Sequence, residues 1–148
     1  MIQISPASPQ ECLLGAELLC QMWQDSTPPQ LAEELSTQIS SGNTALFLAR
    51  DNGTPVAVAQ CGLRHDYVEG AKTSPVGFLE GIYVAPEYRR QGIAARLCRA
   101  CEHWTVQKGC SEFASDCELQ NTDSYQFHKK VGFAEAGRII CFLKRLSE

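Results

Sequence analysis

The segment from Phe78 to Leu97 constrains this chain of 148 residues more than any other part of it. An apolar run, Val76 to Val84, is typical of a central strand, and the turn Arg89-Arg90-Gln91-Gly92-Ile93-Ala94 joins it to a helical pattern. Backbone N–H groups converge at the positive N-terminal end of such a helix. Gly92 allows close approach of the backbone to a ligand, Ala94 avoids crowding it, and the arginines add charge. We therefore interpret the turn as a pyrophosphate site, because a merely solvated basic turn does not account for the glycine at a helix start.

Strand and helix patterns alternate along the rest of the chain. The expected elements are a strand at Ile2–Ile4, helices from Ser8-Pro9-Gln10-Glu11 and at Gln30–Ile39, strands at Ala45–Arg50, Val56–Leu63 and Val76–Val84, a helix from Gly92, a strand at Glu112–Cys117, a short helix at Asp123–Val131, and a final strand at Arg138–Leu146. This order, βααβββαβαβ, predicts an α/β (α+β) fold with a mixed central sheet flanked by helices. The length fits one domain over residues 1–148.

Short local signals support several of these boundaries. Ser8 and Glu11 have the spacing of a capping box, with Pro9 at the first helical position. Asn52-Gly53 tolerates the positive φ of a tight hairpin turn between two of the strands. Gly42 is placed to close the second helix.

The charge balance narrows the class of partner. A formal charge of -4 and a pI near 5.4 argue against a nucleic-acid binder and favour a polycationic small molecule. The sequence has no basic and apolar signal segment and no apolar run near the roughly 20 residues of a membrane helix. We therefore expect a soluble cytoplasmic protein that does not bind membranes.

The eight cysteines are expected to be mostly buried thiols. Cys12, Cys20, Cys61 and Cys141 stand singly in apolar stretches. The pair Cys98 and Cys101 has CxxC spacing but lies in a helical pattern without a second pair, so packing is favoured over redox chemistry or metal binding. No metal site is expected.

The strand Phe78–Val84, Pro86 and the Arg-x-x-Gly-x-Ala turn resemble the acetyl-CoA motif of the GCN5-related N-acetyltransferases, and the order of elements matches that fold. A narrower set of motifs resembles the aminoglycoside 6'-N-acetyltransferases. This set comprises Arg64-His65-Asp66-Tyr67-Val68, Ser74-Pro75-Val76, Phe78-Leu79-Glu80-Gly81-Ile82, Ala114-Ser115-Asp116, Asn121-Thr122 and Gly132-Phe133. The resemblance implies acetyl-CoA-dependent acetylation of an aminoglycoside 6'-amine by direct transfer, and so antibiotic resistance.

The resemblance also assigns residues to the cosubstrate acetyl-CoA. The backbone of Ile82, Tyr83 and Val84 holds the pantetheine arm. The pyrophosphate residues are Arg90, Gln91, Gly92, Ile93, Ala94 and Ala95. Asn121 matches a position that contacts the cosubstrate, although a helix-capping role accounts for it almost equally well.

On the acceptor side, the resemblance assigns Trp23, Tyr67 and Asp116 to the aminoglycoside, and Glu80, at the centre of the predicted site, is a carboxylate suited to bind the cationic substrate as well. Aromatic rings pack on sugar faces and cations, and carboxylates pair with ammonium groups. Glu80 takes the proton of the attacking amine, directly or through water, or serves mainly as an anchor while proximity drives the reaction. Plain core packing is an equal alternative for Trp23.

His128 stands where many family members carry the tyrosine that protonates the leaving thiolate. Packing beneath the last strand accounts for it at least as well, because a thiol of pKa about 8.5 leaves readily. No cysteine is placed for a covalent acetyl-enzyme. Relatives are commonly homodimers, and the apolar stretch Ile139–Leu143 is a candidate strand for such an interface.

Two departures from the family pattern keep other functions open. Gln24-Asp25 follows Trp23 where relatives have Pro and a polar residue, and Gly137 replaces an expected substrate-side Glu. Asp25, Asp66, Glu69 and Glu135 offer partial replacements for that acid, but scattered surface acids are usually only solvated, and none of them is assigned to the site. The alternatives are an acetyltransferase of the same fold acting on another small polyamine or a protein amine, and a noncatalytic acyl-CoA-binding sensor.

Overall fold

A computed structural model describes residues 1–147. Its centre is a sheet in the order β1-β2-β3-β4-β5. The strands are β1 (Ile2–Pro6), β2 (Thr44–Asp51), β3 (Thr54–Arg64), β4 (Val76–Val84) and β5 (Phe113–Ala114). The first four pair antiparallel with their neighbours, whereas β5 lies parallel to β4. The mixed sheet expected from the sequence is therefore confirmed.

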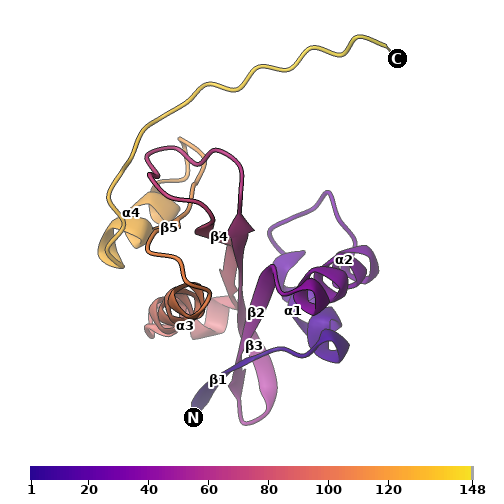
Figure 1. Ribbon diagram of the computed structural model, residues 1–148. Helices are drawn as coiled ribbons and strands as arrows, with labels where there is room; N and C mark the ends of the chain where they lie inside the picture. The colour runs from indigo at the N-terminus through magenta and orange to yellow at the C-terminus, as the bar shows by residue number, and fades with distance from the viewer. Residues whose placement is uncertain (148) are drawn as a thin grey trace.

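Helices cover both faces of this sheet. They are α1 (Cys12–Leu19), α2 (Pro28–Ser41), α3 (Ile93–Gln107) and α4 (Thr122–Lys130), with short 3₁₀ turns at Pro9–Glu11 and Pro86–Tyr88. Figure 1 shows α1 and α2 on one side of the sheet and α3 on the other, with α4 beside β5. None of the helices within residues 1–147 is long and apolar enough to cross a membrane.

The alternation of side chains along β2 divides the core into two layers. Leu46 and Leu48 point to the layer under α1 and α2, while Ala45 and Ala49 join the layer under α3. Because successive side chains of a strand face opposite sides, one strand supplies both layers. The small alanines on the α3 side admit that helix close to the sheet.

The local signals form as the sequence predicts. The Ser8 backbone N–H donates to Glu11 Oε1 over 2.9 Å within a capping box. Asn52 (φ 49°) and Gly53 (φ 89°) make the β2–β3 turn, and Gly42 (φ 85°) ends α2 in the left-handed conformation. These local structures fix the ends of the N-terminal elements.

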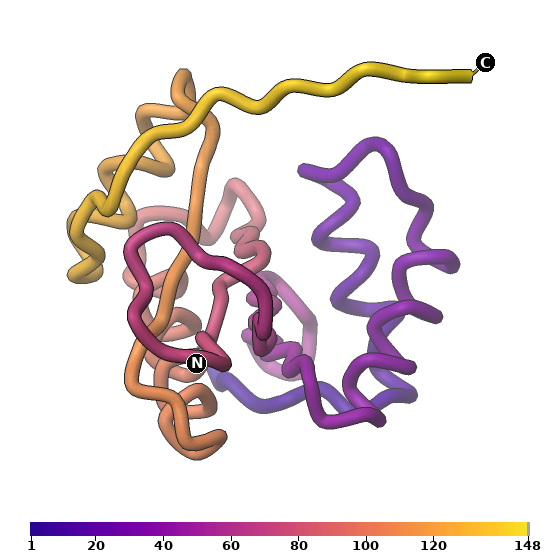
Figure 2. Tube along the Cα trace, turned by 45° about the horizontal axis from the view of Figure 1, so that its top comes forward, coloured from indigo at the N-terminus to yellow at the C-terminus, as the bar shows by residue number. Residues whose placement is uncertain are grey.

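The predicted final strand at Arg138–Leu146 is wrong. Residues 134–147 carry no helix or strand. The first of them contact the loop between β3 and β4, and the rest extend away from the body of the chain as a C-terminal arm (Figures 1 and 2). The apolar residues that suggested a strand are instead exposed, with Ile140 at 82% and Phe142 at 90%. The composition of this stretch favours a strand, but a strand also needs a neighbouring strand to pair with, and composition does not show whether one is present.

The expectations for the strand at Glu112–Cys117 and for Cys141 also need correction. The ladder there is limited to Phe113 and Ala114, because the chain diverges from β4 immediately afterwards. Cys141 is exposed, since it belongs to the C-terminal arm, and Cys20 is only half-buried.

Candidate functional site

Glu80 lies in a β-bulge of β4. Gln60 of β3 pairs with Gly81 and Cys61 pairs with Leu79, so Glu80 has no partner across this ladder. An extra residue in one strand bends it and redirects the side chain, and such bulges are common beside active sites. The Glu80 carboxylate accepts two hydrogen bonds from Arg64, the last residue of β3, over 2.7 and 3.0 Å. From the sequence, Arg64 was recognised only as part of a motif, and its pairing with Glu80 was not predicted.

The strands β4 and β5 separate just before this bulge. Their ladder joins Gly77 to Phe113 and Phe78 to Ala114, after which β4 continues to Val84 without β5 beside it. At the point of separation the Ser115 hydroxyl donates to the Leu79 carbonyl over 3.3 Å. Along this part of β4, on the side where β5 lay, the backbone groups of Ile82, Tyr83 and Val84 have no strand partner among residues 1–147. An extended ligand could therefore bind along this edge.

The turn before α3 holds two residues in the left-handed region. Arg90 has φ 62°, and Gly92, the N-cap of α3, has φ 79°. A non-glycine residue at positive φ is uncommon and often marks a ligand-binding site. The first N–H groups of α3, including those of Ile93, Ala94 and Ala95, have no acceptor within the helix and present a positive pole to an anion.

Arg89 does not face this anion-binding end. Its Nε donates to the Val84 carbonyl over 2.8 Å, and its guanidinium lies 5.5 Å from the centroid of the Tyr83 ring. The side chain is thus folded back along β4. The positive charge at the turn comes from Arg90, which is exposed.

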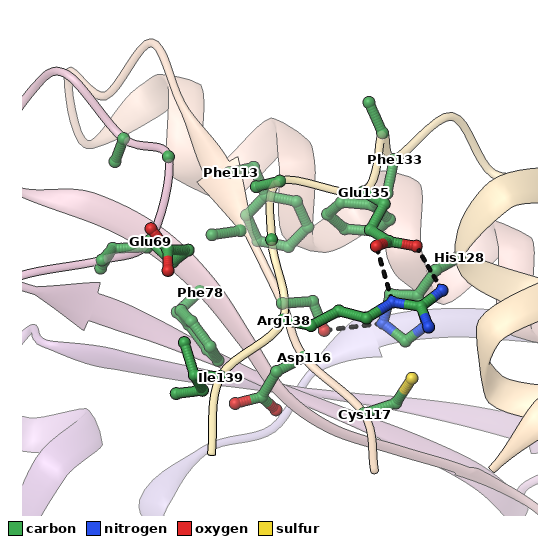
Figure 3. Close-up of a pocket in the computed structure, with 18 of the residues that line it drawn as sticks. Glu69, Phe78, Phe113, Asp116, Cys117, His128, Phe133, Glu135, Arg138 and Ile139 are labelled. Atoms are coloured by element: carbon green, nitrogen blue, oxygen red, sulfur yellow. Dashed lines mark hydrogen bonds and ion pairs between the residues drawn. The ribbon is translucent and has the colours of Figure 1, made fainter. Parts of the chain in front are cut away.

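Two hollows flank the Arg64–Glu80 pair. The larger, about 750 Å³, is lined by Arg64, Tyr67, Asp116 and His128 among others. Figure 3 shows Asp116 and His128 in its wall, with Ile139 from the start of the C-terminal arm nearby. The smaller hollow, about 440 Å³, is lined by Glu80 with polar neighbours that include Gln60 and His65. The Oε1 atom of Gln60 is buried and has no hydrogen-bond partner within residues 1–147.

Trp23 lies directly against β4. A methyl group added at Gly81 would come within 2.5 Å of the Trp23 ring, so the indole occupies the space that this glycine leaves open. The ring is half-buried and packs on the layer under α1 and α2. Trp23 therefore combines the packing role considered from the sequence with a contact one residue from Glu80.

Tyr67 belongs to the loop between β3 and β4, and it is 81% exposed. Its hydroxyl donates to Glu69 Oε2 over 2.7 Å, and this hydrogen bond raises the pKa of Tyr67. Glu69 also lies next to Gly137, where an added methyl group would sit 3.3 Å from its Cγ. An acid, Glu69, thus lies beside Gly137, where the resemblance led us to expect a glutamate.

His128 is held at both ring nitrogens. Its Nδ1 lies 2.6 Å from the Ser124 carbonyl, and its Nε2 lies 2.7 Å from the Ser115 hydroxyl. Because a carbonyl only accepts, Nδ1 carries a proton, and the single hydroxyl proton of Ser115 is shared between Nε2 and the Leu79 carbonyl. Ser115 was not predicted as a site residue, although the Ala-Ser-Asp motif that contains it was an available signal.

Asn121 is the N-cap of α4. Its Oδ1 accepts a hydrogen bond from the Ser124 N–H over 3.1 Å. This confirms the capping role considered from the sequence, while the contact to the cosubstrate stays a prediction that uses the amide NH₂.

Cys98 and Cys101 point into the core from α3, with exposures of 1% and 0%. Burial raises the pKa of the Cys98 thiol to about 12. A thiol in that state is protonated and poorly nucleophilic, which supports packing for the CxxC pair. Among residues 1–147 no group of three or more His, Cys, Asp or Glu side chains could hold a metal ion.

Comparisons with known proteins agree with this geometry. Residues 15–133 match the model of the acetyltransferase (GNAT) family. An aminoglycoside N(6')-acetyltransferase type 1 of Serratia marcescens is 44% identical over 84% of this chain and 86% of its own length. The crystal structure of AAC(6')-Ih from Acinetobacter baumannii has a TM-score of 0.89 and 38% identity, covering 99% of this chain and 100% of that one.

A further solved structure carries ligand information. It is AAC(6')-Iy in complex with the bisubstrate analogue CoA-S-monomethyl-acetylneamine, with a TM-score of 0.90, 34% identity, and coverage of 98% of this chain and 99% of that one. The chain therefore belongs to the acetyltransferase (GNAT) family, within the group of aminoglycoside N(6')-acetyltransferases.

Proposed function

We propose that this protein transfers the acetyl group of acetyl-CoA to the 6'-amino group of an aminoglycoside and so confers antibiotic resistance. The observation that carries the proposal is the construction of β4. This strand carries Glu80 in its bulge. Beyond the bulge, as far as Val84, no residue of β5 pairs with it, and the chain then continues towards the turn at Gly92. An amine held at the bulge and a thioester laid along the strand are brought together for direct attack in a ternary complex.

Acetyl-CoA fits the residues on one side of this strand. The backbone groups of Ile82, Tyr83 and Val84 that face away from β3 are offered to the pantetheine arm, and the Val84 carbonyl there also accepts a hydrogen bond from Arg89. The pyrophosphate is held by the N–H groups of the turn Arg90-Gln91-Gly92-Ile93-Ala94-Ala95. Within residues 1–147, no atom outside the turn lies within 4 Å of the position that a Cβ of Gly92 would take, so the phosphates can approach the backbone there. The Asn121 amide NH₂ adds a donor.

The aminoglycoside occupies the other side, between Trp23, Tyr67, Glu80 and Asp116. Its ammonium groups pair with the carboxylates, and its sugar faces pack on the aromatic rings. The Glu80 carboxylate receives the 6'-amine and, directly or through water, the proton that the nitrogen loses on attack. The acetyl carbon then gains its bond to nitrogen and loses its bond to sulfur.

His128 serves the leaving thiolate. Ser115 lies between Nε2 of His128 and the Leu79 carbonyl, at the point where β4 and β5 separate. In the imidazolium form, His128 carries a second proton at Nε2. This proton passes to Ser115 Oγ while the Ser115 hydroxyl proton moves to the thiolate, which leaves coenzyme A thiol and neutral His128. His128 is the donor in this step, and Ser115 is the group that contacts it.

The C-terminal arm supports a homodimer. Its large apolar side chains are 71–90% exposed: Ile139, Ile140, Phe142, Leu143 and Leu146. The sheet of the same chain ends with β5, whose two residues pair with β4. An apolar segment with strand propensity and a sheet edge are complementary, so the arm of one copy can add to the edge of a second copy.

We extend the proposal to organisation and location. Residues 1–148 act as a single acetyltransferase domain in the cytoplasm, where acetyl-CoA is available. All eight cysteines are free thiols, as expected in a reducing compartment.

The test is release of coenzyme A thiol from acetyl-CoA by the purified protein. Kanamycin, which carries a 6'-amine, is compared with a close analogue that carries a 6'-hydroxyl. Release with the amine alone is the expected result. Equal release with both compounds, or release with neither, would contradict the proposal and favour another amine substrate or a binding-only role.

A further inference from the structure

The Arg64 side chain is held by two neighbours in the proposed aminoglycoside site, Glu80 and Phe78. Its Nε donates to Glu80 Oε2 over 3.0 Å and its terminal NH2 group donates to Oε1 over 2.7 Å. The guanidinium carbon lies 3.5 Å from the centroid of the Phe78 ring, within the range of a cation–π contact. Hydrogen bonding to Glu80 raises the pKa of Arg64, and the nearby Asp116 charge adds to this effect.

These contacts fix a side chain that is otherwise accessible. The Arg64 side chain is 41% exposed and that of Glu80 is 28% exposed. Phe78 is buried at 5% exposure, so the ring provides a rigid plane on which the guanidinium rests. A planar fork held on one face in this way can orient a carboxylate in two dimensions, which a single point charge cannot do.

The pair also stands between the two hollows of the site. Arg64 lines the larger hollow, with Tyr67 and Asp116, while Glu80 lines the smaller. A carboxylate offers about four lone-pair positions, and the fork uses two of them. The remaining positions stay open to an incoming amine or water, so Arg64 does not block Glu80 but restricts its direction.

We propose that Arg64 is a positioning residue for acetyl transfer: its guanidinium, stacked on Phe78, holds the Glu80 carboxylate in the orientation that receives the acceptor amine. This inference rests on the proposed function, because it assigns a task within the same site. Glu80 comes from a bulge that no residue of β3 opposes, and Arg64 supplies the constraint that the ladder does not. Loss of such alignment is costly, since misplacement by about 1 Å can reduce rates by about 100-fold.

A double-mutant cycle tests this assignment. The variants are Arg64→Lys, Glu80→Gln and the combination of both, and kcat and KM are measured for kanamycin and for acetyl-CoA. Arg64→Lys keeps the charge but loses the fork, so kcat with kanamycin should fall about 10- to 100-fold while the KM for acetyl-CoA stays unchanged. In the Glu80→Gln background the same change should have no further effect, because Arg64 acts through Glu80.

Arg50→Lys is the matched control. Arg50 also pairs with a glutamate, Glu11, over 2.6 Å, and contacts Ser5, but it lies on β2 and lines neither hollow. This variant should keep wild-type kinetics. Arg64→Gln provides a second replacement should the lysine variant fold poorly, with thermal melting as the check on both.

The outcomes separate the two proposals. Suppose that the wild-type protein acetylates kanamycin. If the effects of Arg64→Lys and Glu80→Gln on kcat then multiply in the double variant, or if Arg64→Lys raises the KM for acetyl-CoA as much as it lowers kcat, the role of Arg64 is overturned and the proposed function stands. Wild-type kinetics in both Arg64→Lys and Arg64→Gln would do the same. Absence of turnover by the wild-type protein on any aminoglycoside would overturn both proposals.

Discussion

The hydroxyl of Ser115 lies 2.7 Å from Nε2 of His128, at the point where β4 and β5 separate. The two residues are 13 positions apart in the sequence. Ser115 follows β5 directly and His128 lies on α4, so the fold joins two residues that belong to separate sequence motifs. In the proposed reaction, this contact directs the imidazole towards the site of thioester cleavage.

His128→Ala removes this imidazole. We expect kcat to fall about tenfold, a modest loss because a thiol is already a good leaving group, with the KM values for both substrates unchanged. Steady-state kinetics across a pH series are the measurement. Ser115→Ala should show part of the same loss, and unchanged turnover in both variants would exclude a role in thiolate protonation.

Gly92→Ala changes the turn before α3. The residue has φ 79°, a conformation that costs a non-glycine residue about 1 kcal/mol or more, while the space around the added methyl group is open. We expect lower thermal stability and a several-fold rise in the KM for acetyl-CoA, because the phosphates lose close approach to the backbone.

Gly109→Ala is the control for this effect. Gly109 has φ 88°, also with open space around it, but it follows the C-terminal end of α3. Its stability loss should match that of Gly92→Ala, while the KM for acetyl-CoA remains at the wild-type value. A similar rise in KM for both variants would mean that the turn has no special role in binding.

Gly81→Ala should displace Trp23. The added methyl group would lie 2.5 Å from the indole ring, so the ring must move away from β4. We expect a several-fold higher KM for kanamycin and a stability loss of about 1–3 kcal/mol from overpacking. Kinetics and thermal melting measure the two effects.

Gly15→Ala is the control that separates the loss of stability from the rise in the KM for kanamycin. Its methyl group would lie 2.5 Å from Leu46 Cδ2 in the same core layer, so it should lower stability by a similar amount. The KM for kanamycin should not change, because Leu46 is 1% exposed in the core, whereas Trp23 is half-buried and contacts the residue next to Glu80. Should both variants raise this KM alike, Trp23 would be a packing residue only.

The double variant Ile140→Ser and Phe142→Ser removes two exposed apolar groups from the C-terminal arm. If the arm joins two copies, the molar mass measured by light scattering after size exclusion should shift from dimer to monomer. Val106→Ser, which alters a residue 67% exposed on α3, should leave the mass unchanged. A monomeric wild-type protein would contradict the role given to the arm.

Local patterns predicted most of the fold because they act within a few residues. The capping box at Ser8, the turn at Asn52-Gly53 and the cap at Gly42 each depend on neighbouring atoms alone. The final strand failed for the opposite reason. Ile139 and Ile140 have strand propensity, but a strand requires a partner, and these residues pair with no strand within residues 1–147.

In the candidate site, too, features set by neighbouring residues were predictable, and features set by contacts between distant residues were not. The left-handed turn at Gly92 was predictable, because the glycine, a small alanine and two arginines lie together within a few consecutive residues. The bulge at Glu80 was not, because it arises from the pairing register with Gln60 and Cys61 on another strand. The partnership of Arg64 with Glu80 likewise depends on tertiary geometry, since it joins residues 16 positions apart.

The most direct test of the proposed reaction is the position of the acetyl group on kanamycin after incubation with acetyl-CoA and the purified protein, determined by NMR of the isolated product. We expect a single new amide at the 6'-nitrogen. An acetyl group on another amine, or unmodified kanamycin, would contradict the assignment.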